Sequence, residues 1–263
     1  MRMTTLTILG CGGSAGVPAI GNQWRACDPM DTRNHRLRPS AVVRSAETTI
    51  MIDTGPDFRQ QLNRTGITKI DAVLYSHFHG DHINGFEELR VIRNKGQGLI
   101  PIYADPTTQT VLKTRYPHMF ETKDPTGFYP LPIEFKGWEP QDTEKQHKIG
   151  DISVSLVPMI HGEQAALGYR FNDTAYCTDL HDLTETGYQA LENVKTLIID
   201  CNNMFEHHRG MHLNFEAVQE INARLKCPDV ILTHLKNTSD YKTTNAQLPD
   251  GYRLAYDGME LAL

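Results

Sequence analysis

The sequence has little of what marks a membrane protein or a nucleic-acid-binding protein. Its 263 residues include no apolar run of about 20 residues, the length that a membrane-spanning helix needs. Its formal net charge is −6, with 26 Lys and Arg against 32 Asp and Glu, so the chain has no general attraction for polyanions. We therefore expect no membrane partner and do not favour a nucleic-acid partner, while a homodimer stays open.

Cysteine is also scarce. The chain has five, an odd number without regular spacing: Cys11, Cys27, Cys177, Cys201 and Cys227. This argues against a disulfide framework and for reduced thiols, as in a cytoplasmic protein. The first ten residues are too short and too mixed in polarity for a secretory signal, and they read as a strand.

Strand-like and helical patterns alternate along the chain. The apolar periodicity predicts strands at 5–10, 41–44, 49–53, 71–75, 100–103, 152–157, 167–171, 174–177, 196–200 and 230–233. It predicts helices at 85–94, 106–116, 183–191 and 214–225. Residues 117–150 are rich in Pro, Gly and charge, and we expect a long irregular connection there. Strands interleaved with helices favour a layered α/β fold.

The most informative segment is residues 76–82, which read S-H-F-H-G-D-H. Alternate side chains of an extended chain share a face, so His77, His79 and Asp81 start in one direction. The turn that follows swings His82 towards the same space. This set of donors has imidazole nitrogens and a carboxylate but no thiolate, which suits Zn²⁺, Mn²⁺ or Fe. It suits two ions better than one. The alternative is a His-rich surface turn.

Three further donors follow apolar strands, where the loops of an α/β fold gather into a site. They are His161, Asp179 and His234. Each is weak evidence alone, but with the cluster they complete a two-metal site. One ion would be held by His77, His79 and His161, the other by Asp81, His82 and His234. Asp179 would bridge the two ions, a geometry that clamps an in-line displacement at phosphorus.

A glycine-rich turn at residues 10–16 invites a phosphate-loop interpretation. It lacks the Lys-Ser/Thr ending of a Walker loop, and its spacing is not that of a dinucleotide-binding turn. We favour a tight turn that brings backbone close to the metal site.

The arrangement resembles the metallo-β-lactamase superfamily. The resemblance rests on the H-x-H-x-D-H cluster, the downstream donors, and the segments T-I-L-G-C-G-G-S-A-G-V-P at 7–18, I-L-T-H at 231–234 and Y-D-G-M-E at 256–260. Within the superfamily the chain is most similar to the phosphodiesterase that acts on phosphoribosyl 1,2-cyclic phosphate in the carbon–phosphorus lyase pathway. The resemblance covers nearly the whole chain and implies one αββα sandwich domain, residues 1–263, with two metals at the sheet edges.

The same resemblance implies roles for residues outside the ligand set. Asp53 would orient metal ligands. His212 lies where related enzymes place a non-ligand histidine that protonates the leaving oxygen or binds phosphate, and its ordinary pKa suits that role. His212 and Asp81 are the candidate catalytic residues. We expect His207 and His208 to be exposed loop residues, and His181 could line the pocket.

One departure concerns a second metal. The phosphodiesterase carries a C-x-C-x-x-C cluster that, with a late histidine, holds a structural zinc. Here the corresponding residues are Asn22, Trp24, Cys27 and Asn237. One thiol cannot hold that ion, so we expect no structural zinc. Because this loop borders the site, the departure also weakens the exact substrate assignment.

The sequence therefore predicts a dinuclear metal-dependent phosphodiesterase for a small cyclic phosphodiester such as phosphoribosyl 1,2-cyclic phosphate. A tRNA 3′-end endonuclease is one alternative, although the chain has no basic arm for tRNA. A thioester or lactone hydrolase would use a similar metal bridge. A non-catalytic, metal-binding role in cofactor biosynthesis is the alternative outside the enzymes.

Overall fold

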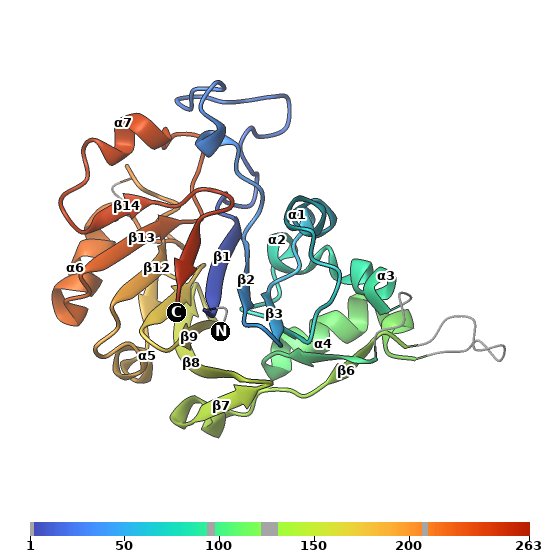
Figure 1. Ribbon diagram of the computed structural model, residues 1–263. Coiled ribbons are helices and arrows are strands. Elements are labelled where there is room, and N and C mark those ends of the chain that lie inside the picture. The colour runs from blue at the N-terminus through green and yellow to red at the C-terminus, as the bar shows by residue number, and fades with distance from the viewer. Residues whose placement is uncertain (1–2, 94–97, 122–130, 207–209) are drawn as a thin grey trace.

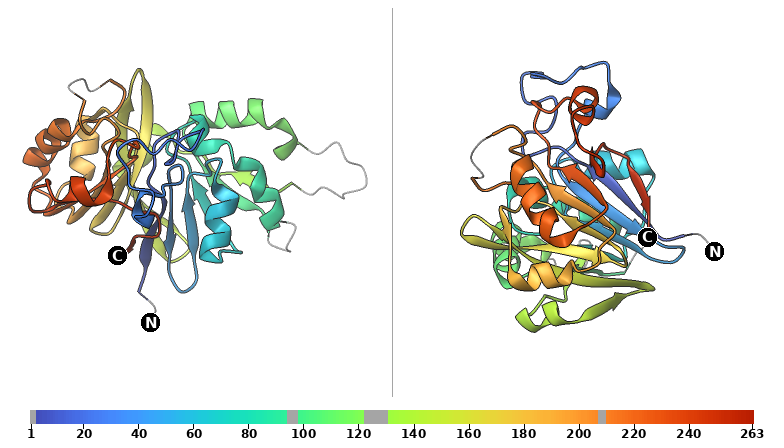
Figure 2. Two further views of the ribbon diagram at one scale, coloured as in Figure 1. Left: turned by 90° about the horizontal axis from the view of Figure 1, so that it is seen from above. Right: turned by 90° about the vertical axis from the view of Figure 1, so that its left-hand side faces the viewer.

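Two β-sheets lie face to face, with helices on both outer faces (Figures 1 and 2). The computed structural model describes residues 3–93, 98–121, 131–206 and 210–263. The order of layers is helix, sheet, sheet, helix, which confirms the predicted αββα sandwich. No helix in these ranges is long and apolar enough to cross a membrane.

The first sheet has seven strands and four α-helices on its outer side (Figure 1). The strands, in their order across the sheet, are β15 (Glu260–Ala262), β1 (Thr5–Gly10), β2 (Ser40–Arg44), β3 (Thr49–Ile52), β4 (Ala72–Leu74), β5 (Ile100–Tyr103) and β6 (Ile133–Phe135). The helices are α1 (Phe58–Thr65), α2 (Gly80–Ile83), α3 (Leu89–Arg93) and α4 (Pro106–Arg115).

The second sheet has eight strands and is covered by α5 (Glu185–Ala190) and α6 (Phe215–Leu225). Its strands run in the order β11 (Asp182–Leu183), β8 (Ile152–His161), β9 (Gln164–Phe171), β10 (Thr174–Cys177), β12 (Thr196–Asp200), β13 (Asp229–Thr233) and β14 (Tyr252–Leu254). β7 (Gln146–Ile149) also pairs with β8. A short helix, α7 (Tyr241–Asn245), precedes β14.

Alternation along the strands builds the core between the two sheets. Leu6 and Ile8 of β1, Tyr176 of β10, Ile198 of β12 and Ile231 of β13 are all buried there. Their neighbours in the chain face the helices instead, as expected when side chains alternate between the faces of a strand. Both sheets are thus apolar on both faces, which matches the apolar runs in the sequence.

Both sheets share one pairing pattern. In each sheet, the first four strands in the order given above pair antiparallel with their neighbours. The fourth strand then pairs parallel with the fifth, and the pairs that follow are also parallel. The carboxyl ends of parallel strands lie at one edge of a sheet, where loops form binding sites. The segments after β3, β4, β10, β12 and β13 meet there and form the site described below.

Two predicted segments differ from the structure. Residues 122–130 of the predicted connection 117–150 lie outside the described residues, and the described remainder contains the edge strands β6 and β7 and two short 3₁₀ turns. Strands of three or four residues are too short to show a period amid Pro and charged residues. The predicted helix at 85–94 is a 3₁₀ turn (Phe86–Glu88) followed by the short helix α3.

A buried arginine ties the long loop before β2 to the segment after β13. Arg36 is 1% exposed. Its Nη1 donates to the Lys236 carbonyl at 3.0 Å and its Nη2 to the Ser239 carbonyl at 2.7 Å. Asn34 Nδ2 donates to Asp240 Oδ2 at 2.7 Å in the same network. Hydrogen bonds of a buried guanidinium are strong, so this network fixes the loop against the segment that follows His234.

The carboxyl group of Asp257 gives a testable pH effect on stability. It accepts backbone N–H groups from Cys11 at 3.0 Å and Leu37 at 2.8 Å, and burial raises its pKa to about 6. An unfolded Asp titrates near pH 3.9, so this group stabilises the folded state at low pH. That contribution is lost as the pH rises from about 4 to 6 and amounts to roughly 3 kcal/mol.

We therefore expect the wild type to gain stability relative to Asp257→Asn on acidification. Urea unfolding at pH 4.5 and pH 7.5 measures this, and the wild type minus variant difference in unfolding free energy should be larger at pH 4.5. An equal difference at both values would show that Asp257 titrates normally.

Candidate metal centre

The turn after β4 positions the histidine cluster. His77 and His79 lie on the extended segment that leaves β4, and Asp81 and His82 lie in the first turn of α2. The helical turn, rather than a continued strand, brings Asp81 and His82 to the same space. Gly55 makes this possible, since a Cβ there would lie 2.1 Å from the Asp81 carbonyl oxygen.

The second sheet contributes three side chains from strand ends. His161 ends β8, Asp179 follows β10, and His234 follows β13. Asp179 and His234 have φ values of 56° and 59°, the left-handed region that residues other than glycine rarely adopt. Such strain persists only where the surrounding structure enforces it, and it is common at functional sites.

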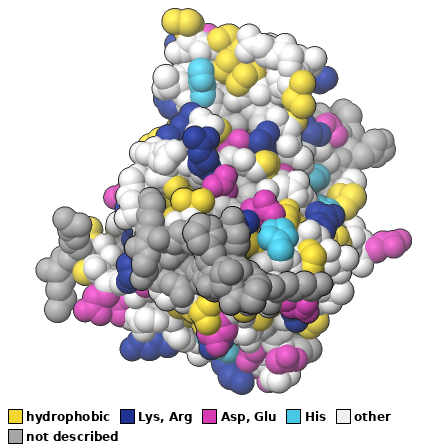
Figure 3. Space-filling model, turned by 90° about the vertical axis from the view of Figure 1, so that its right-hand side faces the viewer, with side chains coloured by type: hydrophobic (Ala, Val, Ile, Leu, Met, Phe, Trp, Pro, Cys, Tyr) yellow, Lys and Arg dark blue, Asp and Glu magenta, His cyan; other side chains and the backbone are white. Residues whose placement is uncertain are grey.

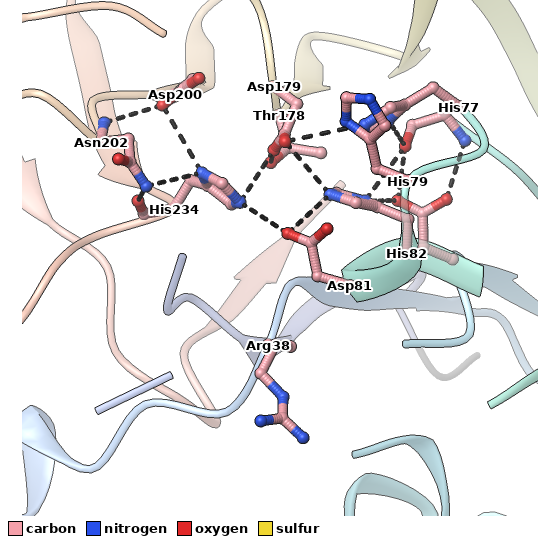
Figure 4. A network of polar contacts seen from close by, with 12 residues as sticks. Arg38, His77, His79, Asp81, His82, Thr178, Asp179, Asp200, Asn202 and His234 are labelled. Atoms are coloured by element: carbon pink, nitrogen blue, oxygen red, sulfur yellow. Dashed lines mark hydrogen bonds and ion pairs between the residues drawn. The ribbon is translucent and has the colours of Figure 1, made fainter. Parts of the chain in front are cut away.

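Two of the groups of side chains that could hold a metal ion match the predicted sets, and both include Asp179 (Figure 4). The ligand atoms within each group lie within 4.8 Å of one another. One group comprises His77, His79, His161 and Asp179, and the other comprises Asp81, His82, Asp179 and His234. The structure thus brings together all seven side chains that the sequence singled out, in the two sets proposed.

The contacts of Asp179 show how it reaches both groups. Its Oδ2 lies 3.7 Å from His77 Nε2 and 3.9 Å from His161 Nε2. The same oxygen is 3.3 Å from His82 Nε2, while Oδ1 is 3.1 Å from His234 Nε2. Asp81 Oδ2 completes the second group at 3.5 Å from His82 Nε2 and 3.4 Å from His234 Nε2. One carboxylate therefore faces four imidazoles from two sides.

The chemistry of these donors fits divalent metal ions. The Nε2 atoms of His77 and His82 are buried and have no hydrogen-bond partner among the described residues. Buried polar atoms are nearly always paired, so two such atoms aimed at shared carboxylates call for an additional ligand. Imidazole nitrogens with carboxylate oxygens suit Zn²⁺, Mn²⁺ or Fe.

Further contacts fix the orientation of the imidazoles. His82 Nδ1 lies 2.8 Å from Asp53 Oδ2, and Asp53 also accepts the Ser76 N–H at 2.8 Å and the Ser76 hydroxyl at 2.7 Å. His161 Nδ1 lies 2.9 Å from the Met211 carbonyl. Donation through Nδ1 leaves the Nε2 lone pair free for a metal, the arrangement that outer contacts typically impose on ligand histidines. Asp53 thus contacts one of the candidate ligands directly, and its role in orienting metal ligands stays a prediction.

Burial controls the protonation of the first group. It lowers the pKa of His161 to about 4 and lowers the pKa of His77 and His79 as well. These imidazoles are neutral near pH 7, the form that binds metal. His82 differs: burial lowers its pKa, but the carboxylates of Asp179, Asp53 and Asp81 outweigh burial and raise it. The second group therefore concentrates negative charge, which favours a cation.

His212 belongs to neither of these two groups, but with Asp179, Asp200 and His234 it forms a third group whose ligand atoms lie within 4.8 Å of one another. Its ring stacks on His234 with centroids 4.9 Å apart, and its Nδ1 donates to Asp200 Oδ2 at 2.6 Å. Burial lowers its pKa, but the bond to Asp200 outweighs burial and raises it. Asp200 is fully buried and also accepts the N–H groups of Leu180 and Asn202. His212 is therefore held in a fixed orientation at the edge of the site.

Sequence reasoning missed Asp200 and Asn202. Asn202 Nδ2 lies 3.0 Å from His234 Nδ1 and donates to the His234 carbonyl at 2.8 Å. The available signal was position, because Asp200 ends β12, which lies between β10 and β13, the strands that Asp179 and His234 follow. His181 accepts the Gly162 N–H at 3.0 Å and so supports the turn after His161. His207 and His208 lie outside the described residues.

Comparison with known proteins agrees with this geometry. The family described as Beta-lactamase superfamily domain matches residues 48–235. A crystal structure described as a new diphosphatase from the PhnP family superposes with a TM-score of 0.88 at 34% identity, covering 100% of this chain and 98% of that one. Zn²⁺-bound PqqB from Methylobacterium extorquens shares the fold, with a TM-score of 0.70, 18% identity, and coverage of 98% and 100%.

Curated relatives are more distant and mostly longer. An octanoyltransferase from Porphyromonas gingivalis is 29% identical over 255 residues, 96% of this chain and 50% of that protein. A ribonuclease Z from Bradyrhizobium diazoefficiens is 25% identical over 177 residues, 66% of this chain and 51% of that protein. The chain thus spans about half the length of these two relatives. By its sequence, its fold and its His/Asp groups, the chain belongs to the metallo-β-lactamase superfamily, in its PhnP-like branch.

Proposed function

We propose that the chain is a metal-dependent phosphodiesterase that hydrolyses a small phosphodiester. The observation that carries the proposal is the pair of His/Asp groups that share Asp179, with the His212–Asp200 pair beside them. Paired metal sites with a common carboxylate are typical of enzymes that displace groups at phosphorus. A cyclic phosphodiester such as phosphoribosyl 1,2-cyclic phosphate is our leading substrate.

The seven side chains would hold two divalent ions, Zn²⁺ or Mn²⁺, with Fe as a further option. His77, His79 and His161 would bind one ion and Asp81, His82 and His234 the other, with Asp179 shared. When bound, such ions supply Lewis-acid charge and an activated water for attack on phosphorus. Asp53, Asn202 and the Met211 carbonyl would hold the ligand imidazoles in position.

His212 would act as the proton donor to the leaving oxygen. Asp200 accepts from Nδ1, which leaves Nε2 as the atom that carries the transferable proton. The raised pKa of His212 keeps it protonated closer to neutral pH, the state that a general acid needs. Asp81 remains a candidate for both ligation and catalysis because its carboxylate is part of the second group.

We expect no structural zinc in the loop that precedes β2. Asn237 Nδ2 donates to the Gln23 carbonyl at 2.8 Å, so this side chain already connects the two segments. Arg36 and its partners supply the remaining cross-links. Cys27 is the one thiol among the four residues at the corresponding positions, which are Asn22, Trp24, Cys27 and Asn237.

A substrate panel tests the proposal. Charged side chains of both signs are interspersed on the face in Figure 3, and the net charge is −6, so we expect small phosphodiesters to be preferred to tRNA. The measurement is kcat/KM with defined metals on a small cyclic phosphodiester, bis-nitrophenyl phosphate, a tRNA precursor and a thioester. Far more efficient cleavage of the tRNA precursor would establish the endonuclease alternative, and cleavage of the thioester alone would establish the thioesterase alternative.

A diphosphatase is the second candidate. It is favoured by the 34% identity to the PhnP-family diphosphatase over the full length of both chains. Attack at phosphorus in a diphosphate uses the same residues, but the leaving group is a phosphate that needs less protonation. A diphosphate diester in the same panel distinguishes the two candidates.

A further inference from the structure

A pocket outside the metal centre lies where three segments far apart in the sequence meet. Its volume is about 390 Å³, far more than the roughly 10–15 Å³ that one water needs by this measure, so it can hold a small organic molecule. The lining residues come from the loop before β2, the last turn of α1 and the segment between β14 and β15; they are Thr32, Arg33, His35, Arg64, Tyr256 and Asp257. None of them belongs to the His/Asp groups of the metal centre.

Arg64 gives the pocket a cation that has no hydrogen bond. Its side chain is 49% exposed, and its guanidinium donates to no atom of the residues that the structure describes. Its ionic partner is Asp257, whose Oδ2 lies 3.7 Å from Arg64 Nη1, too far for a hydrogen bond. A guanidinium carries five N–H donors in a planar fork that matches a carboxylate or a phosphate. These donors of Arg64 are therefore available to a ligand.

The carboxylates beside the pocket are engaged elsewhere. Each oxygen of Asp257 accepts a backbone N–H group, from Cys11 at 3.0 Å and from Leu37 at 2.8 Å. Asp31 forms a two-point pair with Arg33, through Nε at 2.8 Å and Nη2 at 2.7 Å. Because an ionised Asp257 repels an anion, the affinity for a ligand has to come from directed hydrogen bonds rather than from net charge.

The remaining polar atoms of the lining are mostly donors. The hydroxyl groups of Thr32 and Tyr256 make no hydrogen bond in the described part of the chain. Arg33 Nη1 takes no part in the pair with Asp31. A pocket in which donors outnumber free acceptors suits a ligand that is rich in acceptors, and the oxygens of a phosphate or a carboxylate are acceptors only when ionised.

Aromatic rings give the pocket an apolar part as well. Tyr256 packs edge-on against Tyr241, with ring centroids 5.8 Å apart, and His35 packs against Trp24, with ring centroids 4.7 Å apart. His35 Nε2 also donates to the Pro29 carbonyl at 2.9 Å. These contacts hold Tyr256 and His35 in position before a ligand arrives, which reduces the entropy cost of binding. Rings and arginine stems in the lining favour an organic ligand over a bare ion.

We propose that this pocket binds a small organic oxyanion, a carboxylate or a phosphate ester on a planar apolar body. Arg64 contacts the anionic head through two N–H groups, and Tyr256 packs against the body. No lining residue is a proposed metal ligand or catalytic residue, so this binding is independent of the proposed hydrolysis.

Two matched probes test the proposal in the metal-loaded protein: para-bromobenzoate and para-bromophenyl phosphate, with para-bromobenzyl alcohol as the uncharged reference. By calorimetry, we expect at least one anionic probe to bind more tightly than the alcohol, and the tighter of the two identifies the head group. Hydrogen bonds to a charged group change affinity by roughly 10–100-fold, so Arg64→Gln should weaken that probe at least about tenfold. Arg59→Gln changes an exposed arginine on the same helix and should bind as wild type.

Anomalous diffraction from bromine in crystals soaked with the tighter probe gives its position. The expected peak lies between Arg64 and Tyr256. Binding that Arg64→Gln leaves unchanged and Asp179→Ala abolishes would place the anion at the metal centre and overturn the proposal. Equal binding of all three probes, no binding of either anion, or a bromine peak away from Arg64 and Tyr256 would overturn it as well.

Discussion

Replacing Asp179 with alanine is expected to remove both metal ions and to lower hydrolysis by at least about 10³-fold. Loss of a side chain that only orients a metal ligand typically lowers metal affinity or activity 10–100-fold. Asp179 is itself a proposed ligand of both ions, so its loss should have a larger effect. Its two oxygens face His77, His161, His82 and His234, so neither group keeps its full set of donors without it. Elemental analysis and the phosphodiester assay measure the two losses.

The control for this prediction lies at the other end of the same strand. Asp173 precedes β10, is half-exposed and pairs with Lys195 at 2.5 Å. Asp173→Ala should keep both ions and full activity. Retention of two ions by Asp179→Ala would show that the carboxylate is not shared between them.

Replacing His212 with alanine is expected to leave both ions in place and to lower turnover by about 10²–10⁴, the usual contribution of one positioned proton donor. The loss should be largest for a substrate with a poorly departing alkoxide and smallest for a nitrophenyl ester. A general acid matters only where charge builds on the leaving oxygen, which a nitrophenolate tolerates unaided. Steady-state kinetics on the two esters, together with metal analysis, measure this difference.

Asp200→Asn is the companion variant, because it nearly preserves shape while weakening the bond that orients His212. We expect Asp200→Asn to lower turnover less than His212→Ala does, with the same dependence on the leaving group. An unchanged melting temperature of the variant would exclude general misfolding. Equal losses on both esters in His212→Ala would indicate phosphate binding rather than proton donation. Unchanged kinetics on both esters would show that His212 has no role in catalysis and only precedes α6.

The gathering of the seven donors was predictable because these residues keep a simple relation to the strands. His77, His79, Asp81 and His82 fall within six residues after an apolar strand, and three other donors lie at strand ends. Residues at the carboxyl ends of parallel strands lie at one edge of the sheet, independently of the conformation of the loops. The layered α/β class followed from the same strands, and the order of layers followed from the family resemblance.

Contacts between distant segments could not be predicted. Arg36 looks like any surface arginine in sequence, yet it is buried by partners some 200 residues away. Asp200 looks like the polar end of a strand until His212 is placed against it. The shared pairing pattern of the two sheets was equally invisible, because no repeat appears in the residues and backbone pairing needs none. The edge strands β6 and β7 were missed because three or four residues show no period.

The central claim is that two metal ions share Asp179. Anomalous X-ray diffraction from crystals grown with Mn²⁺ or Zn²⁺ tests it most directly. The account predicts two peaks per chain, one among His77, His79 and His161 and one among Asp81, His82 and His234, with the Asp179 carboxylate contacting both. A single peak under metal-replete conditions, or peaks away from these residues, would contradict it.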